Sequence, residues 1–168
     1  LGRLAAEQLL GLADLARRYG DGSLRLTPWQ SVLLANIAET AADAVIHSLH
    51  ALGLLTDASE PLARIIACTG ASGCAKGLAD TKADALRLAE LLPAGSERPG
   101  IHLTGCSRSC AAAHRAPFTL LAVAEGRYDL FARQPLGNGF GQLLGHHLTP
   151  DDAAELLASL TATRSFTR

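Results

Sequence analysis

Four cysteines are the residues of this 168-residue sequence best suited to metal chemistry. Five residues separate Cys68 from Cys74, three separate Cys106 from Cys110, and 31 lie between the two pairs. Both short intervals contain small residues, so the backbone can wrap closely around a metal centre and present N–H groups to sulfur. The four thiolates therefore predict a 4Fe-4S cluster.

Other roles for the cysteines also have to be considered. Disulfides are disfavoured in a cytoplasmic protein, because the cellular thiol pool keeps cysteines reduced. Structural zinc also takes four thiolates, but its first interval is usually about two to four residues, shorter than the interval here. Inert buried thiols would need neither paired spacing nor neighbouring glycines. A non-catalytic four-cysteine module, for electron transfer or zinc, stays open as an alternative to an enzyme.

Each cysteine pair follows a predicted strand. A strand over residues 63–67 ends at Cys68, and a second over residues 101–104 ends before Cys106. Apolar spacing between the pairs predicts a helix that ends near Pro93. The residues that mark this helix are Leu78, Ala85, Leu86, Ala89 and Leu92.

The first third of the chain predicts a separate domain. Helical spacing over residues 4–19 and 42–52 flanks two short strands at 24–27 and 31–37. The buried face of the first helix would comprise Ala5, Leu9, Leu12 and Ala16. This order is that of a ferredoxin-like β-α-β-β-α-β unit without its first strand. A polar stretch at 56–61 predicts the boundary, so we expect an α+β fold with domains at 1–56 and 57–168.

Three further elements are predicted after the second cysteine pair. Residues 118–124 and 127–132 flank Glu125-Gly126 as a hairpin. The glycine-rich run 137–145 is predicted to be a loop. A last helix begins after Thr149, whose side chain and that of Asp152 form a capping box.

Composition narrows the class of protein. The 15 basic and 16 acidic residues are spread along the chain, so nothing concentrates the positive charge that nucleic acid binding requires. No apolar stretch is long enough to span a bilayer, and no secretory signal is recognisable. We expect a soluble cytoplasmic protein that binds neither nucleic acid nor membrane.

The cysteine pattern resembles a known superfamily. The Cys68 to Cys74 spacing, followed by Thr104-Gly105-Cys106-Ser107-Arg108-Ser109-Cys110, is similar to the cluster-binding signature of sulfite and nitrite reductases. The resemblance implies that residues 57–168 form a mixed α/β domain of that type, which binds the cluster and a tetrapyrrole. It also implies that Cys110 lies nearest the tetrapyrrole, which in those reductases is sirohaem.

Other segments resemble the precorrin-3B synthase family, especially its C-terminal half. They comprise Leu24 to Trp29, Ala79 to Ala85 and Gly126 to Leu130. A reductase usually carries an acidic residue shortly after the last cysteine, followed by an aliphatic and a small residue, where this chain has Pro117-Phe118-Thr119. This departure favours the synthase family over a reductase.

The synthase resemblance implies an oxidoreductase of aerobic cobalamin biosynthesis. Such an enzyme uses oxygen to hydroxylate precorrin-3A and forms a lactone. The partners implied are that tetrapyrrole, an N-terminal half that this chain lacks, and an electron donor. A sirohaem-dependent sulfite or nitrite reductase fragment is the alternative enzyme.

Basic residues near the cysteines are candidates for binding the carboxylates of a tetrapyrrole, since Arg and Lys pair with carboxylates. These candidates are Lys76, Arg108, His114 and Arg115. The synthase resemblance further implies a mononuclear non-haem iron. His114, the pair His47 and His50, and the pair His146 and His147 are candidate ligands for a site of two histidines and one carboxylate.

Overall fold

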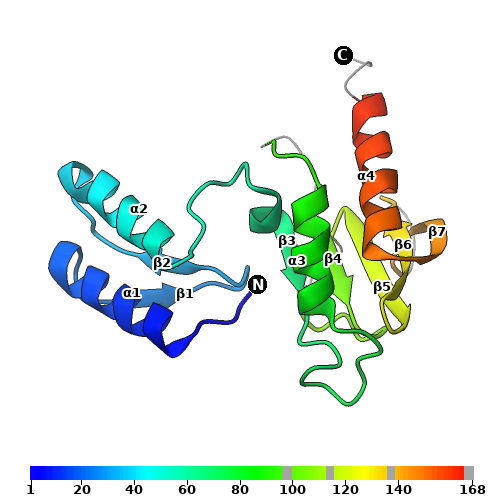
Figure 1. Cartoon of the computed structure of the whole chain (residues 1–168), viewed down its shortest axis with the longest axis horizontal. Helices are drawn as coiled ribbons and strands as arrows, with labels where there is room; N and C mark the ends of the chain where they lie inside the picture. The colour runs from blue at the N-terminus through cyan, green and yellow to red at the C-terminus, as the bar shows by residue number, and fades with distance from the viewer. Residues whose placement is uncertain (96–99, 113–115, 136–138, 165–168) are drawn as a thin grey trace. The chain divides into compact units, whose positions relative to one another are not determined.

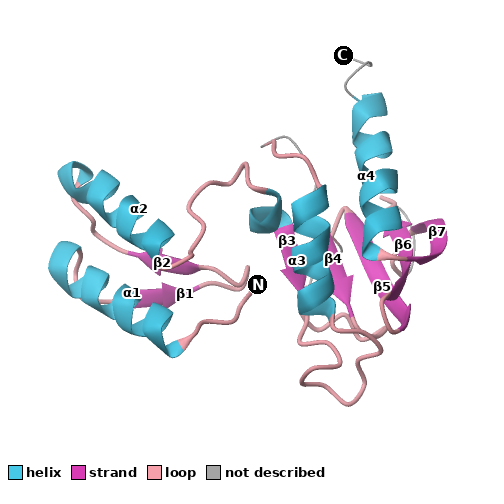
Figure 2. Ribbon diagram, in the orientation of Figure 1, coloured by secondary structure: helices cyan, strands magenta, loops and turns pink. Residues whose placement is uncertain are grey.

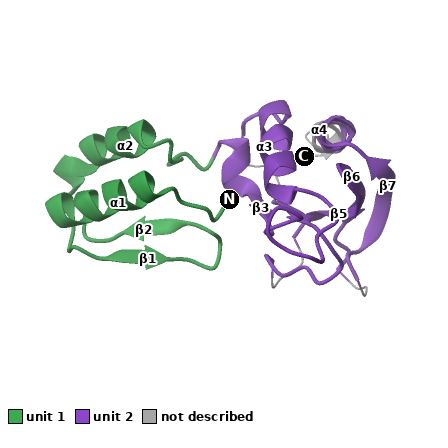
Figure 3. Cartoon of the chain, turned by 60° about the horizontal axis from the view of Figure 1, so that its bottom comes forward, with its two compact units in different colours: residues 1–58 green, residues 59–168 purple. Residues whose placement is uncertain are grey.

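The computed structural model describes residues 1–95, 100–112, 116–135 and 139–164. The chain divides into two compact units, residues 1–58 and 59–168, which Figure 3 shows in different colours. None of the helices in the described ranges combines the length and apolar character that a membrane span requires.

Two helices and two strands form the first unit. They are α1 (Ala6–Tyr19), β1 (Leu24–Leu26), β2 (Val32–Leu34) and α2 (Ala42–Ala51), with the short 3-10 helix η1 (Glu39–Ala41) before α2. The antiparallel pair β1-β2 carries both helices on one side (Figure 3). The predicted order of helix, strand, strand and helix is confirmed.

The buried face of α1 is confirmed in part. Leu12 and Ala16 are buried as predicted, and so is Leu15, whereas Leu9 is 50% exposed. The buried residues of α1 therefore all lie from Leu12 onward. The apolar periodicity continues into the first turns of the helix, where the rest of the unit does not cover it. The two helices approach closely at Gly11, where an added Cβ would lie 2.6 Å from a methyl of Leu52.

A five-stranded mixed sheet forms the core of the second unit. Its order is β3 (Ile65–Ala67), β4 (Ile101–Thr104), β5 (Phe118–Ala124), β6 (Arg127–Ala132) and β7 (Gln142–Leu148). The pairs β3-β4 and β4-β5 are parallel, and the remaining pairs are antiparallel. The short 3-10 helix η2 (Pro61–Arg64) occupies the start of the strand predicted at 63–67.

The helices α3 (Thr81–Leu91) and α4 (Pro150–Arg164) pack beside each other on this sheet (Figures 1 and 2). The hairpin of β5 and β6 has the predicted bounds. The capping box of α4 is also confirmed, because the hydroxyl of Thr149 accepts from Asp152 N–H at 3.1 Å and Thr149 N–H donates to the Asp152 carboxylate at 3.0 Å.

The glycine-rich run 137–145 is a loop only in part, so this prediction is corrected. Its first two residues lie outside the described ones, and β7 begins within the run at Gln142. Gly145 belongs to this strand, opposite Leu130, where the register shifts. An added Cβ at Gly145 would lie 2.9 Å from Leu148, so this glycine permits a bulge and close packing.

The helix predicted between the cysteine pairs is confirmed as α3, but it begins after Leu78. Thr81, Lys82, Ala85 and Leu88 are buried, whereas Leu78 precedes the helix and is 51% exposed, and Leu86 is 49% exposed. Asp80 is the N-cap, with its carboxylate accepting from Ala83 N–H at 3.3 Å. This start places positions 81, 85 and 88 on the inner face.

Candidate metal centre

Parallel pairing of β3 and β4 brings the two cysteine pairs to one edge of the sheet. Ala67 lies opposite Leu103, and Cys68 N–H donates to the Leu103 carbonyl at 3.1 Å. Cys106 follows the end of β4 by two residues. Since the carboxyl ends of neighbouring parallel strands meet at the same edge, both cysteine loops begin side by side (Figure 1).

Three glycines join these two loops. An added Cβ at Gly105 would lie 3.1 Å from Gly77 Cα, 3.5 Å from Gly70 Cα and 3.6 Å from Cys68 Sγ. Leu78 N–H donates to the Gly105 carbonyl at 2.9 Å, which holds the loops together. We call Gly70, Gly77 and Gly105 the glycine cradle. The backbones of the two loops approach so closely here that a side chain at any of the three positions would be crowded by neighbouring atoms.

The first cysteine loop, residues 68–80, folds back on itself. Gly70 has a φ of +68°, a left-handed conformation that glycine adopts without strain. Ala71 N–H then donates to the Ala79 carbonyl at 2.8 Å, and Gly77 N–H donates to the Cys74 carbonyl at 2.9 Å. Cys74 is thereby held in the same folded loop as Cys68.

The second cysteine loop is a tight turn. The Thr104 hydroxyl donates to the Cys106 carbonyl at 2.8 Å, and Ser109 N–H approaches the same carbonyl at 3.4 Å. Ser109 has a φ of +54°, which reverses the chain just before Cys110. Cys106 and Cys110 consequently lie on one turn.

The environment of Cys68 favours its thiolate. Burial raises the pKa of this thiol, but hydrogen bonds to its sulfur, above all those from the backbone N–H groups of Gly105 and Gly70, outweigh burial and leave the pKa below its ordinary range. The Gly105 N–H bond to Sγ measures 3.2 Å. The thiolate is the form of cysteine that binds metals.

The donor set and its surroundings fit an iron–sulfur cluster. All four cysteines are free thiols; Cys68 and Cys106 are half-buried, and Cys74 and Cys110 are exposed. Within the described ranges, no three His, Cys, Asp or Glu side chains are close enough together to bind one metal ion. A cubane cluster differs from a single ion, because each thiolate binds its own iron and the sulfurs can lie further apart.

The structure describes only two of the four predicted substrate-binding residues. Lys76 is exposed on the first cysteine loop and Arg108 is exposed on the second, so both cations flank the candidate centre. His114 and Arg115 lie outside the described residues.

The histidines of the two predicted pairs lie away from the cysteine loops in sequence and in their contacts. His47 and His50 are exposed on α2, where the His50 ring lies 2.7 Å from the Thr56 hydroxyl. The His146 ring lies 3.4 Å from the Asp129 carboxylate, but His147 contacts that carboxylate through its backbone N–H. These described histidines therefore do not form the predicted two-histidine, one-carboxylate site, and the non-haem iron stays a prediction.

Sequence reasoning missed two residues that lie behind Cys68. Thr81 is fully buried, and its hydroxyl donates to the Cys68 carbonyl at 2.8 Å. Lys82 is 8% exposed, and its ammonium donates to the Ala67 carbonyl at 3.2 Å. Asp80 followed by Thr81 is a helix-start signal that would have placed both residues in the first turn of the helix, but it does not predict that they are buried.

Comparisons with known proteins connect both units to one group of enzymes. Residues 1–52 match the family described as the nitrite/sulfite reductase ferredoxin-like half domain. A ferredoxin–nitrite reductase from Synechococcus elongatus is 40% identical over 136 residues, which are 77% of this chain and 26% of that protein. A protein named sulfite reductase (ferredoxin) 2 from Mycolicibacterium paratuberculosis is 31% identical, over 90% of this chain and 30% of its own length.

A solved structure supports the same relationship. The Mycobacterium tuberculosis NirA protein superposes with a TM-score of 0.74 at 26% identity, over 95% of this chain and 33% of that one. The predicted fold class, a partial ferredoxin-like unit followed by a mixed α/β domain of the nitrite/sulfite reductase type, is confirmed. The chain spans between a quarter and a third of these relatives. They are named nitrite and sulfite reductases, so the narrower resemblance to precorrin-3B synthase is not shown.

Proposed function

We propose that this chain is the cluster-binding part of a nitrite- or sulfite-reductase-type oxidoreductase. The observation that carries the proposal is the 40% identity to a ferredoxin–nitrite reductase across 77% of the chain, which joins the cysteine loops to a half domain of the same enzymes. This proposal reverses the order of the two enzyme readings that the sequence favoured.

Each part of the centre has a role in this proposal. Cys68, Cys74, Cys106 and Cys110 hold a 4Fe-4S cluster, which supplies single electrons when bound. The glycine cradle keeps the backbone close, and Gly105 N–H donates to the sulfur of Cys68. Hydrogen bonds to cluster sulfurs are one means by which proteins set cluster potentials.

The exposed side of the centre suits a large anionic cofactor or substrate. Cys110 is exposed at the end of the second loop, which supports the role of nearest ligand to a sirohaem that the superfamily resemblance implies. Lys76 and Arg108 stand on the two loops and would pair with carboxylates of the macrocycle. The electron donor and the remaining half of the enzyme are further partners in this proposal.

A precorrin-3B synthase-type hydroxylase is the second candidate. The segments from Leu24 to Trp29 and from Ala79 to Ala85 favour it by local resemblance. Pro117 also favours it, because a reductase usually carries an acidic residue at this place. This reading needs the same four cysteines and no sirohaem. The two candidates therefore share the metal centre and differ in the cofactor beside it.

The deciding experiment is anaerobic purification of the chain, with iron, sulfide and zinc analysis and an absorption spectrum. We expect about four irons and four sulfides per chain, lost in the Cys106→Ser variant, and binding of added sirohaem. Reduction of nitrite or sulfite by the complete enzyme with a reduced dye would support the reductase. Oxygen-dependent conversion of precorrin-3A without sirohaem would favour the synthase. Zinc in place of iron would contradict both.

A further inference from the structure

The first turn of α3 lies directly behind Cys68. The Thr81 hydroxyl donates to the Cys68 carbonyl and lies 3.6 Å from its Sγ. An added Cβ at Gly70, two residues after Cys68, would lie 2.6 Å from Thr81 N. The start of this helix and the turn that contains Cys68 are therefore in contact through backbone as well as side chains.

Lys82 brings a positive charge into this contact. Its side chain is buried, and its ammonium donates to the carbonyl of Ala67, the residue before Cys68. Lysine is almost never buried to this extent, because desolvating an ammonium is costly. Charges also interact more strongly in a buried site than in water, so the ammonium of Lys82 acts on the turn that contains Cys68 more strongly than an exposed ammonium would.

Two carboxylates lie close to Lys82 in sequence, and each accepts a hydrogen bond from a neutral donor. Asp80 caps the helix by accepting from Ala83 N–H. Asp84 accepts from the hydroxyl of Tyr128, a fully buried residue of β6, at 2.6 Å. The positive end of the α3 dipole adds to the charge of Lys82, since the helix begins at Thr81.

We propose that Lys82 is a positioning residue that sets the reduction potential of the cluster held by Cys68. Reduction adds one negative charge to the cluster, so a fixed positive charge behind one of its ligands stabilises the reduced form. The inference rests on the proposed function, because it requires a cluster on these cysteines. Lys82 is not itself a cluster ligand. It acts through its hydrogen bond to the carbonyl of Ala67, the residue before the ligand Cys68.

The test is the midpoint potential of the cluster-loaded full chain, measured by a redox titration followed by electron paramagnetic resonance. We expect Lys82→Met to lower the equilibrium constant for reduction about tenfold, which is a fall of about 59 mV for a one-electron couple. Lys82→Gln, which is neutral and polar, should give a fall of similar size. Lys82→Arg should keep the potential near that of the unmodified chain.

A charge on the same helix provides the matched control. Arg87 is exposed, where it pairs with Asp151 of α4 at 2.7 Å, so Arg87→Met removes a positive charge that solvent screens. We expect that variant to leave the potential nearly unchanged. An unchanged potential in both neutral Lys82 variants would overturn the proposal, as would an equal fall in Lys82→Arg or Arg87→Met. A chain that binds iron but shows no effect of Lys82 refutes this inference alone, whereas a chain that binds no cluster refutes the proposed function as well.

Discussion

Gly105 is the residue on which the two cysteine loops depend most directly. Its Cα faces Gly77 and Gly70, and its N–H donates to Cys68 Sγ. A side chain here would have to displace backbone, which cannot yield as a flexible side chain does. The close approach of Gly105 to the first cysteine loop therefore keeps Cys106 near Cys68.

We predict that Gly105→Ala destabilises the fold by about 1 to 3 kcal/mol and lowers cluster occupancy, because the methyl would lie 3.1 Å from Gly77 Cα. Urea unfolding and iron analysis measure both effects. Gly100→Ala is the matched control, since its added Cβ would meet nothing closer than 3.7 Å. Equal stability and iron content in the two variants would contradict the role of the glycine cradle.

His102 is a buried histidine that the proposed chemistry does not use. It is 1% exposed on β4, between Ile66 and Thr119 of the neighbouring strands, and its Nε2 has no hydrogen-bond partner. Burial lowers the pKa of His102 to about 4. The native protein therefore holds this imidazole neutral at pH values where the unfolded chain already binds a proton.

This difference predicts a pH-dependent stability. As pH falls from about 6.5 to about 4, the unfolded state gains a proton on His102 that the native state does not, so the free energy of unfolding falls by up to about 3 kcal/mol. His102→Leu should remove this part of the decline while other groups titrate as before. Urea titrations at pH 7 and pH 5 on both proteins measure it, and parallel declines would refute the prediction.

At the scale of elements, α4 depends on its cap. The Thr149 hydroxyl accepts from Asp152 N–H, and Thr149 also bonds the Asp152 carboxylate through its own hydroxyl, at 2.7 Å. Burial of Ala153 and Leu157 then holds the helix against the sheet. The cap fixes where the helix begins and hence which of its residues face inward.

Thr149→Ala should lower the free energy of unfolding by about 1 kcal/mol, because an N-terminal N–H of the helix loses its acceptor. Thr149→Ser keeps the hydroxyl and should stay within about 0.5 kcal/mol of the unmodified chain. Urea unfolding curves measure the free energy of unfolding, and the midpoints can be compared directly if the dependence on urea concentration is the same in all three proteins. If serine proved as costly as alanine, the methyl of Thr149 and not its hydroxyl would be responsible.

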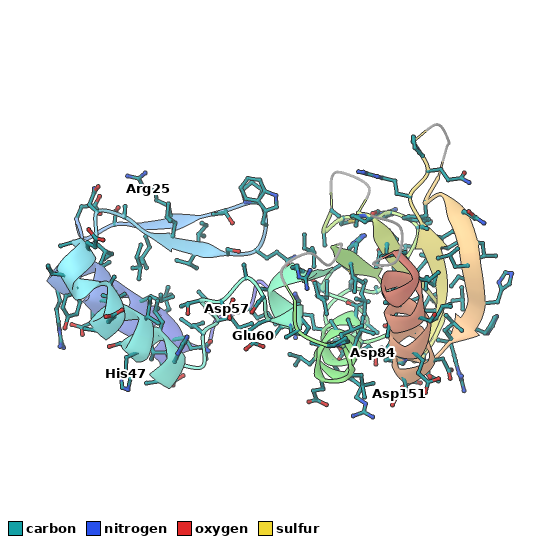
Figure 4. All side chains as sticks on the ribbon, turned by 90° about the horizontal axis from the view of Figure 1, so that it is seen from above. Arg25, His47, Asp57, Glu60, Asp84 and Asp151 are labelled. Atoms are coloured by element: carbon teal, nitrogen blue, oxygen red, sulfur yellow. The ribbon has the colours of Figure 1, made fainter. Side chains whose placement is uncertain are left out.

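At the scale of the whole molecule, the chain consists of two units joined by a segment that ends at η2. Figure 4 labels Asp57 and Glu60 on this segment, and both are exposed. Each unit has its own sheet and its own helices. We therefore expect the connecting backbone to open more readily than either unit.

Brief digestion with a protease that cuts before aspartate should cleave first at Asp57 and yield residues 1–56 and 57–168. The physical reason is that Asp57 is exposed and lies next to the boundary between the two units, whereas cleavage at the other described aspartates requires unfolding within a unit. Mass spectrometry of early time points identifies the cut. Asp57→Asn should abolish it, and an earlier cut at Asp21 or Asp80 would contradict the prediction.

Several features followed from the sequence alone. The strand before each cysteine pair, the hairpin around Gly126 and the capping box at Thr149 were all predicted, because each depends on residues within a few positions of one another. The spacing of the four cysteines predicts a shared metal centre, which stays a prediction.

Only the tertiary structure showed which surfaces meet. The cradle around Gly105, the burial of Lys82 behind Cys68 and the inclusion of Gly145 in β7 depend on segments far apart in sequence. Periodicity predicts that a helix has an apolar face, but the start of the helix and the register of the strands decide which residues that face contains. A charged residue such as Lys82 is buried because its neighbours across β3 and the first cysteine loop offer an acceptor, and no local pattern encodes that acceptor.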